Sequence, residues 1–336
     1  MMTAMRFGRL VLTVFLVAAA TSVAAPTGSA AAGCAPALRA LPGLGGAVAE
    51  ARGMSLGGIV VGTASTPAGE IRAVWWDRAR RVHPIDTGSG LADTALGINE
   101  SGAMVGIAED LEEGLPRAWH RSARGQVRLL PVPAGAIASY AARINRSGLV
   151  VGYVFTGERF AGAVWTSPVQ QPRLLPLPAS FTQAVAFGVD DTGRVSGAVG
   201  TSSGEFRPVL WRRGGPVLLD RRPGTAYAVN NRGQVVGAVG IGEQDRPARW
   251  QRRGAATVLA APGIVYDISS AGRATGRIED AAGLSRAFIW DPRRGVRLLP
   301  SLPGGATGYA VRDPATVAGS TDDGQGRIQA VLWMCA

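Results

Sequence analysis

The sequence contains no lysine, only two histidines (His83 and His120) and only two cysteines (Cys34 and Cys335). Without lysine, the chain lacks the residue that forms Schiff bases and the residue that binds phosphates in a P-loop. So few histidines and cysteines also leave no zinc site built from several of them. We therefore expect no catalytic residues, no metal and no cofactor.

Glycine and proline, by contrast, are abundant. The 336 residues include 47 glycines and 21 prolines, and 46% of all residues are hydrophobic. This composition supports a large core and is typical of many short strands joined by tight turns. All 35 basic residues are arginines, and together with 24 acidic residues they give a formal net charge of +11.

Residues 1–32 are predicted to be a secretory signal peptide. Arg6 and Arg9 precede an apolar run at 10–20, which has the length of a signal core and is too short to span a bilayer. Small residues follow, and cleavage after Ala32 or after Ala24 fits the pattern. We expect residues 33–336 to form a single secreted, extracellular domain without a transmembrane segment or lipid anchor.

The rest of the chain repeats one pattern seven times. Each copy has a turn opened by a polar residue, then a short apolar segment that contains a glycine, and then a tryptophan 13 or 14 residues further on. The glycines, at intervals of 39 to 46 residues, are Gly62, Gly106, Gly152, Gly197, Gly237, Gly276 and Gly319. The tryptophans are Trp76, Trp119, Trp165, Trp211, Trp250, Trp290 and Trp333.

Each copy is predicted to form four short antiparallel strands, exemplified by residues 226–230, 234–238, 286–290 and 296–300. Four strands in this length are the size of one propeller blade. The sequence therefore predicts an all-β protein, a seven-bladed β-propeller. A closed ring leaves only short, protected strand edges, whereas an open array of such units would need capping repeats.

The two ends of the chain indicate how the ring closes. The last copy stops after Trp333, without a fourth strand, and a segment of the missing type occurs at 38–42. We expect this N-terminal segment to join the C-terminal blade as its outermost strand. A disulfide between Cys34 and Cys335 would then replace the missing turn, and an exported compartment permits that bond.

The repeat resembles the HAF repeat of predicted extracellular proteins, a WD40-like propeller repeat. Residues 286–290, Arg-Ala-Phe-Ile-Trp, are the copy most like the His-Ala-Phe strand, with arginine in place of histidine. The Leu-Gly-Gly at 44–46 and the segments that begin at Asn99, Asn145 and Asn230 match the remainder of the pattern. The resemblance implies export and a propeller-like structure, and it implies no catalytic residues.

Charge is expected to be sorted onto the two faces of the ring. The turns after the tryptophans hold eleven arginines against Asp77 and Asp291, and the opposite loops hold thirteen acidic residues against seven arginines. The arginines of this basic face are Arg78, Arg80, Arg81, Arg121, Arg124, Arg212, Arg213, Arg252, Arg253, Arg293 and Arg294. Such a face would orient the protein toward an anionic polymer or surface. The alternative is that these turns are simply polar.

Aromatic residues suggest a candidate binding face. Tyr140, Tyr227, Tyr266 and Tyr309, together with Phe181, are expected in the loops before the inner strands, near the acidic face, where they would rim a sugar- or peptide-binding mouth. The alternative is that they only pack. Nucleic acid is not expected as a partner, because the tryptophans fall at strand ends where blades pack and leave no stacking platform.

Two functions from different classes follow. The first is a secreted, monomeric, non-catalytic binding or interaction module with an unknown protein or polysaccharide partner. The alternative is a carbohydrate-active propeller, either lectin-like or a polysaccharide hydrolase or lyase that uses loop carboxylates. Acid pairs such as Glu109-Asp110 would also be candidates for Ca²⁺, but no D-x-D-x-D-G loop is present.

The predicted disulfide can be tested on the secreted protein by mass spectrometry without reduction, where Cys34 and Cys335 should be found joined. In the chain-entropy model, a loop of about 300 residues gives at most about 5–6 kcal/mol of stabilisation. Reduction should therefore lower the melting temperature of the native protein and leave that of a C34S/C335S variant unchanged. Two free thiols in the native secreted protein would contradict the prediction.

Overall fold

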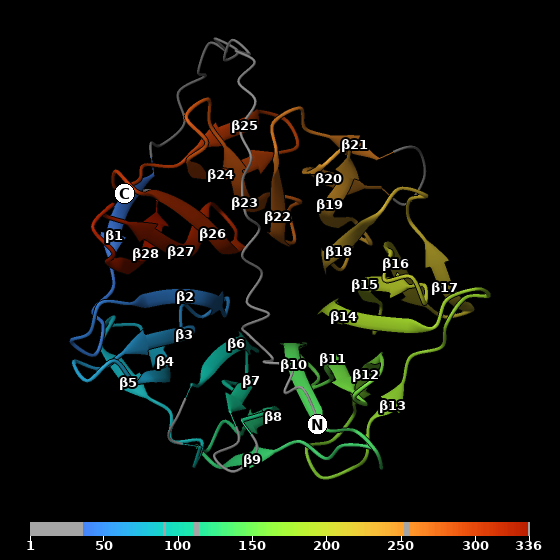
Figure 1. Cartoon of the computed structure of the whole chain (residues 1–336). Helices are drawn as coiled ribbons and strands as arrows, with labels where there is room; N and C mark the ends of the chain where they lie inside the picture. The colour runs from blue at the N-terminus through green and yellow to red at the C-terminus, as the bar shows by residue number, and fades with distance from the viewer. Residues whose placement is uncertain (1–35, 90–91, 110–113, 252–255, 335–336) are drawn as a thin grey trace, which may run out of the picture.

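A computed structural model describes residues 36–89, 92–109, 114–251 and 256–334. Within these ranges the chain is all-β, with 28 strands in seven four-stranded antiparallel sheets arranged as a ring around a common axis (Figure 1). The predicted seven-bladed β-propeller is confirmed. In the part of the chain that is described, no helix is long and apolar enough to cross a membrane. The predicted signal peptide lies outside the described residues.

The strands of each blade follow one another from the axis outward, and blades are numbered 1 to 7 in chain order. The inner strands are β2 (Ala49–Met54), β6 (Thr94–Ile98), β10 (Ala138–Ile144), β14 (Gln183–Val189), β18 (Gly224–Val229), β22 (Gly263–Ile268) and β26 (Gly305–Arg312). The second strands are β3 (Val60–Ser65), β7 (Met104–Glu109), β11 (Val150–Phe155), β15 (Val195–Gly200), β19 (Val235–Ile241), β23 (Ala274–Glu279) and β27 (Thr316–Asp322).

The third strands carry the repeated tryptophans, and the outermost strands are the shortest. The third strands are β4 (Ile71–Trp76), β8 (Pro116–Arg121), β12 (Phe160–Trp165), β16 (Phe206–Arg212), β20 (Gln244–Trp250), β24 (Ser285–Asp291) and β28 (Ile328–Met334). The outermost strands are β1 (Ala37–Ala40), β5 (Val82–Pro84), β9 (Val127–Leu129), β13 (Arg173–Leu174), β17 (Gly215–Leu218), β21 (Thr257–Val258) and β25 (Gly295–Leu298).

Both ends of the chain build blade 7, as predicted. β1 pairs antiparallel with β28, with Leu38 opposite Trp333 and Ala40 opposite Val331, so the N-terminal strand completes the sheet of β26–β28. Figure 1 shows the dark blue β1 against the red β28. Cys34 and Cys335 lie just outside the described residues, and their disulfide stays a prediction.

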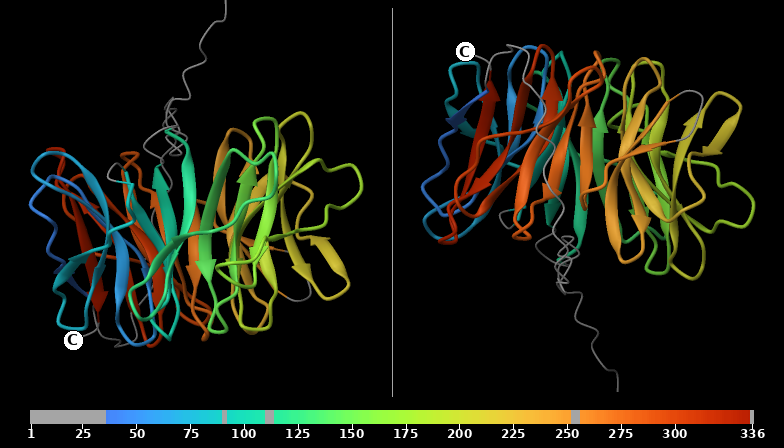
Figure 2. Two further views of the ribbon diagram at one scale, coloured as in Figure 1. Left: turned by 90° about the horizontal axis from the view of Figure 1, so that it is seen from below. Right: turned by 90° about the horizontal axis from the view of Figure 1, so that it is seen from above.

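The ring has two distinct faces, seen edge-on in Figure 2. The asparagine-turn face carries the turns between inner and second strands, together with the turns after the tryptophans. Arg78, in one of the latter turns, donates from Nε to the carbonyl of Gly57, in one of the former, at 3.0 Å. The loop face, on the other side, carries the loops between second and third strands and the connections between blades.

The asparagine turns form because the side-chain oxygen of the first turn residue accepts hydrogen bonds from groups within the turn. Asn145 Oδ1 accepts hydrogen bonds from the Leu149 N–H at 2.9 Å and the Ser147 hydroxyl at 2.8 Å. Gly148 has φ of +88°, a conformation that favours glycine, and its N–H donates to the Asn145 carbonyl. The same arrangement recurs at Asn99, Asp190 and Asn230.

The same residues also bond between blades. Asn99 Nδ2 donates to the Asn145 carbonyl at 3.1 Å, and Asn230 Nδ2 donates to the Ser269 carbonyl at 2.9 Å. Asn145 Nδ2 likewise donates to the Asp190 carbonyl at 2.9 Å. Three blade interfaces are therefore joined by one amide each, buried from water, where a hydrogen bond left unmade is costly.

Other polar groups join the remaining four interfaces on this face. Their donor–acceptor pairs are Leu56 N–H to the Glu100 carboxylate at 2.8 Å, Arg194 Nη2 to the Asn231 carbonyl at 2.8 Å, the Ser269 hydroxyl to the Asp313 carboxylate at 2.9 Å, and Arg312 Nη1 to the Ser55 carbonyl at 3.1 Å. All seven interfaces thus carry a hydrogen bond here, which includes the one between blades 7 and 1.

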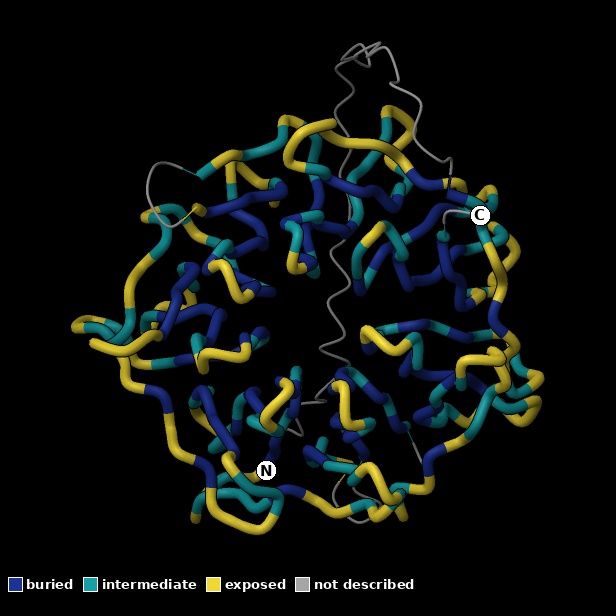
Figure 3. The backbone as a smooth tube through the Cα atoms, turned by 180° about the vertical axis from the view of Figure 1, so that it is seen from behind, coloured by how far each residue is buried: buried dark blue, intermediate teal, exposed yellow. Residues whose placement is uncertain are grey.

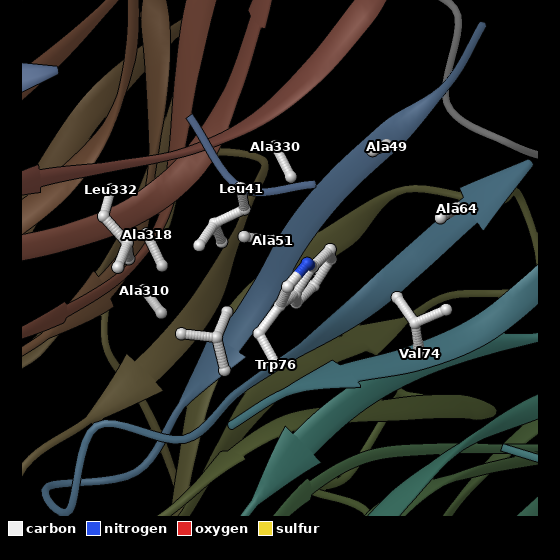
Figure 4. Close-up of a cluster of buried hydrophobic side chains, with 11 residues drawn as sticks. Leu41, Ala49, Ala51, Ala64, Val74, Trp76, Ala310, Ala318, Ala330 and Leu332 are labelled. Atoms are coloured by element: carbon white, nitrogen blue, oxygen red, sulfur yellow. The ribbon is translucent and has the colours of Figure 1, made fainter. Parts of the chain in front are cut away.

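The core lies between blades rather than at the axis. Figure 3 shows buried backbone in the middle of the blades and exposed backbone at the turns and outer edges. One cluster joins Leu41 and Leu332 of blade 7 to Trp76 and Ala51 of blade 1 (Figure 4). Such contacts exclude water from large aromatic surfaces and supply most of the stabilisation.

Four of the repeated tryptophans also hydrogen-bond to the preceding blade. Trp165 Nε1 donates to the Pro131 carbonyl at 2.8 Å, and Trp76, Trp211 and Trp333 donate in the same way to Pro42, Pro176 and Pro300. Each of these prolines directly follows the residue that ends the outermost strand pairing. Before blade 2 the position equivalent to these prolines is occupied by Asp86. The Nε1 of Trp119, in blade 2, has no hydrogen-bond partner among the described residues.

Asn145 offers a test of the coupling between turn and ring. Asn145→Ala removes partners from the Leu149 N–H and the Asp190 carbonyl, and should lower the free energy of unfolding by about 2–4 kcal/mol. Asn145→Ser keeps an acceptor in the turn, as Ser55 does in blade 1, and loses the bond between blades, so it should lose about half as much. Urea denaturation measures both.

Arg146→Ala is the control, because Arg146 lies in the same turn and its ion pair to Asp191 is long and exposed. We expect a change below about 0.5 kcal/mol. Equal losses for Asn145→Ala and Asn145→Ser would place the whole effect between blades and contradict a role of Asn145 in its own turn.

Candidate binding site on the ring axis

Each inner strand has a β-bulge at the same point, three residues before the residue that opens the asparagine turn. The pairing with the second strand skips one residue there, and a bulged residue has its side chain re-aimed. The skipped residues, all partly exposed, are Arg52, Leu96, Ala142, Phe187, Tyr227, Tyr266 and Tyr309. The repeat therefore provides one variable position per blade beside the axis.

Aromatic rings form a continuous arc across blades 3 to 7. Around the arc the centroids lie 4.4 Å apart for Tyr140–Tyr153, 6.0 Å for Tyr153–Phe187, 5.2 Å for Phe187–Tyr227, and 5.5 Å for both Tyr227–Tyr266 and Tyr266–Tyr309. The structure therefore brings all four predicted tyrosines together. We call these six rings the aromatic arc.

The tyrosines do not lie in loops, as the sequence suggested, but within the inner strands β10, β18, β22 and β26. Sequence reasoning missed Tyr153 and Phe187. Phe187 could have been found, because it stands three residues before Asp190 just as Tyr227 stands three residues before Asn230. Tyr140 stands two residues earlier than this position and reaches the arc by stacking on Tyr153.

Charged groups flank one end of the arc. The Arg52 guanidinium lies 4.1 Å from the centroid of the Tyr309 ring and forms a 2.6 Å ion pair with Glu50. The Tyr309 hydroxyl is 3.3 Å from the same carboxylate. Burial raises the pKa of Tyr309 to about 12. Burial disfavours the charge of Arg52, but the attraction of Tyr309 and Glu50 outweighs it and raises the pKa of Arg52.

An ion pair crosses the ring toward the asparagine-turn face. Arg143 of blade 3 lies 3.5 Å from Asp267 of blade 6, which also accepts the Val311 N–H at 2.8 Å. Both residues directly follow a bulge, where the other five blades have only glycine or alanine: Gly53, Gly97, Gly188, Ala228 and Ala310. Burial raises the pKa of Asp267, and the charge of Arg143 opposes that shift.

Arg143 and Asp267 line a polar cavity of about 300 Å³ at this end of the axis, together with Asn99, Asn145 and Asn230. The inner strands run from the loop face to the asparagine-turn face. Tyr140 and Glu50, which precede the bulges, therefore lie on the loop-face side, and the ion pair lies on the other side. The two ends of the axis differ in chemistry.

The arginines of the predicted basic face lie on the asparagine-turn face where they are described. Arg81 bonds Asp77 at 2.8 Å, and the Arg121 guanidinium lies 5.7 Å from the Trp75 ring. The side chains that project into solvent are Arg78, Arg80, Arg81, Arg124, Arg212, Arg213, Arg293 and Arg294. Arg252 and Arg253 lie outside the described residues.

Several carboxylates of the loop face form local ion pairs. Glu70 bonds Arg72 at 2.9 Å, and Glu205 bonds Arg207 at 2.7 Å. Asp280 bonds Arg286 at 2.7 Å; burial opposes its ionisation, but this bond and two backbone N–H groups prevail and lower its pKa. Among the described residues, no three His, Cys, Asp or Glu side chains gather in a group that could hold a metal ion.

Solved structures share the architecture of this chain. The virginiamycin B lyase of Staphylococcus aureus superposes with a TM-score of 0.57 at 11% identity, over 89% of this chain and 99% of that one. The fold is that of propeller proteins. A putative TolB from Agrobacterium tumefaciens gives a TM-score of 0.51 at 15% identity, over 77% and 96% of the two chains.

A puromycin-hydrolyzing peptidase of Mycobacterium tuberculosis gives a TM-score of 0.53 at 14% identity, over 87% of this chain and 52% of that one. Neither a family model nor a curated protein matches the sequence. At identities this low, the structural match establishes a shared fold only. No activity is carried over from these proteins to this chain.

The raised pKa of Tyr309 predicts a loss of stability in alkali. The unfolded phenol ionises near pH 10, so above this pH the unfolded state loses its proton first. Stability should fall from about pH 10 until the folded pKa of about 12 is passed. Urea unfolding across this range should show a shallower fall for Tyr309→Phe. An equal fall in both proteins would contradict the assignment.

Proposed function

We propose that the protein is a secreted, non-catalytic β-propeller that binds a ligand at the aromatic arc. One observation carries the proposal: six aromatic rings from five blades form an unbroken, partly exposed surface beside the axis. Aromatic side chains combine a large apolar area with few rotatable bonds, which suits recognition.

The charged groups near the axis support binding rather than catalysis. A general acid or base needs a carboxylate that is free to exchange a proton near neutral pH. Glu50 is bonded to Arg52, Asp190 to Arg194 at 2.5 Å, and Asp267 to Arg143. Each of these carboxylates is therefore bonded to an arginine within the architecture of the ring.

Export and family membership are part of the same proposal. The pattern of residues 1–32 supports a secretory signal, and the match of the repeat to the HAF pattern supports membership of that family of extracellular proteins. Export would be tested by N-terminal sequencing of the protein recovered from the medium.

A saccharide is the ligand class that one further observation favours. Arg52 and Glu50, two planar polar groups, stand beside the Tyr309 ring. The apolar C–H face of a sugar could pack on the rings while its hydroxyls bond to guanidinium and carboxylate. This is the lectin-like form of the carbohydrate-active alternative, and a hydrolase or lyase that uses loop carboxylates is the catalytic form.

A glycan array and a turnover assay on the same polysaccharides would test the proposal. We expect binding without turnover, about thirtyfold or more weaker for Tyr227→Ala, since an aromatic anchor covered by the ligand contributes about 2 kcal/mol or more. Tyr227→Phe keeps the ring and should retain most of the affinity.

Two results would contradict parts of the proposal. Hydrolysis or elimination that disappears with Glu205→Gln would show a catalytic protein. Binding that is insensitive to Tyr227→Ala and Tyr309→Ala would place the ligand away from the arc. Thermal melting of each variant shows whether it retains the native fold.

A further inference from the structure

A groove opens between blades 4 and 5 on the asparagine-turn face, away from the aromatic arc. Its volume is about 650 Å³, within the range of ligand-binding sites. Blade 4 contributes Arg194, Arg212 and Arg213 together with Leu210, Val217 and Leu219, and blade 5 contributes its asparagine turn.

The groove is open because the hairpin beside it is short. β16 and β17 are joined by residues 213–214 alone, whereas the same connections in blades 1 and 2 comprise residues 77–81 and 122–126. Gly214 and Gly215 have φ of +95° and +105°, which allows so tight a turn. The turn is too short to fold over the gap between the blades.

Positive charge at the groove is not neutralised. Arg212 and Arg213 are exposed, and their guanidinium groups form no hydrogen bond or ion pair with another described residue. Arg194 is paired with Asp190 at 2.5 Å. Asp191, the acidic residue that lines the groove, accepts a hydrogen bond from Asn231 at 2.8 Å and is paired with Arg146 at 4.0 Å. Two free guanidiniums therefore stand beside the groove without a matching anion.

The floor of the groove is aliphatic. Leu210, Val217, Leu219 and Val235 line it, and Val217 is 36% exposed. No aromatic side chain is among the lining residues, so nucleobases would find no surface on which to stack. A ligand that fits must therefore combine negative charge with small aliphatic groups.

We propose that this groove binds an acidic peptide segment of a partner protein. Carboxylates of the peptide would pair with Arg212 and Arg213, and its aliphatic side chains would cover Leu210 and Val217. The site is separate from the aromatic arc, so its failure would leave the proposed function untouched.

The test uses the mature protein and a fluorescein-labelled peptide of alternating glutamate and leucine, followed by fluorescence anisotropy. We expect binding that weakens with salt and becomes about tenfold weaker in the R212A/R213A variant. R293A/R294A is the matched control, because it removes two exposed arginines from the equivalent turn of blade 6. It should change the dissociation constant less than twofold.

Val217→Asp tests the floor, and it should weaken binding at least as much while the melting temperature stays near that of the native protein. Equal losses in both double variants would show a diffuse basic surface and overturn the proposal. So would equal affinity for polyglutamate, polygalacturonate and a single-stranded oligonucleotide. Absence of peptide binding at low salt would overturn it as well.

Discussion

The asparagine that begins the turn in blades 2, 3 and 5 holds this ring together, because its side chain bonds in two directions. In Asn99, Asn145 and Asn230 the oxygen fixes the turn of its own blade, while the nitrogen bonds the backbone of the next blade. Apart from the Arg143–Asp267 pair across the axis, the hydrogen bonds described here join neighbouring blades, so they link the conformation of each turn to the geometry of the ring. A shift of one of these blades would break the hydrogen bonds within its turn and the hydrogen bond to the next blade.

Because these bonds fix the turn, the residue at the bulge three positions earlier is free to vary from blade to blade. The bulged side chain takes no part in the ladder between inner and second strands, and the turn is fixed without it. One framework therefore presents Arg52, Leu96 or Tyr227 at the same place in different blades. The aromatic arc is the result of five consecutive blades that place rings at or beside this position.

The repeat and its period were sufficient to predict the seven blades, the strand order and the completion of blade 7 by residues 38–42. They are local and periodic features, and a closed ring follows from them. The bulge could not be predicted, because a register shift depends on the partner strand. The same holds for Arg143 and Asp267, which are far apart in sequence and meet only across the axis. The groove depends on a glycine pair visible in the sequence, but its opening depends on the neighbouring blade.

The axis is asymmetric, and this decides how a ligand can reach the arc. Toward the asparagine-turn face, Arg143 and Asp267 bridge the ring, and a bound molecule would have to separate a partly buried pair, which is costly. Toward the loop face, Tyr140 and Glu50 present a ring and a carboxylate without such a bridge. Access to the arc is therefore expected from the loop face. The groove between blades 4 and 5 lies on the other face, so a ligand at the arc and an acidic peptide in the groove would not compete for space.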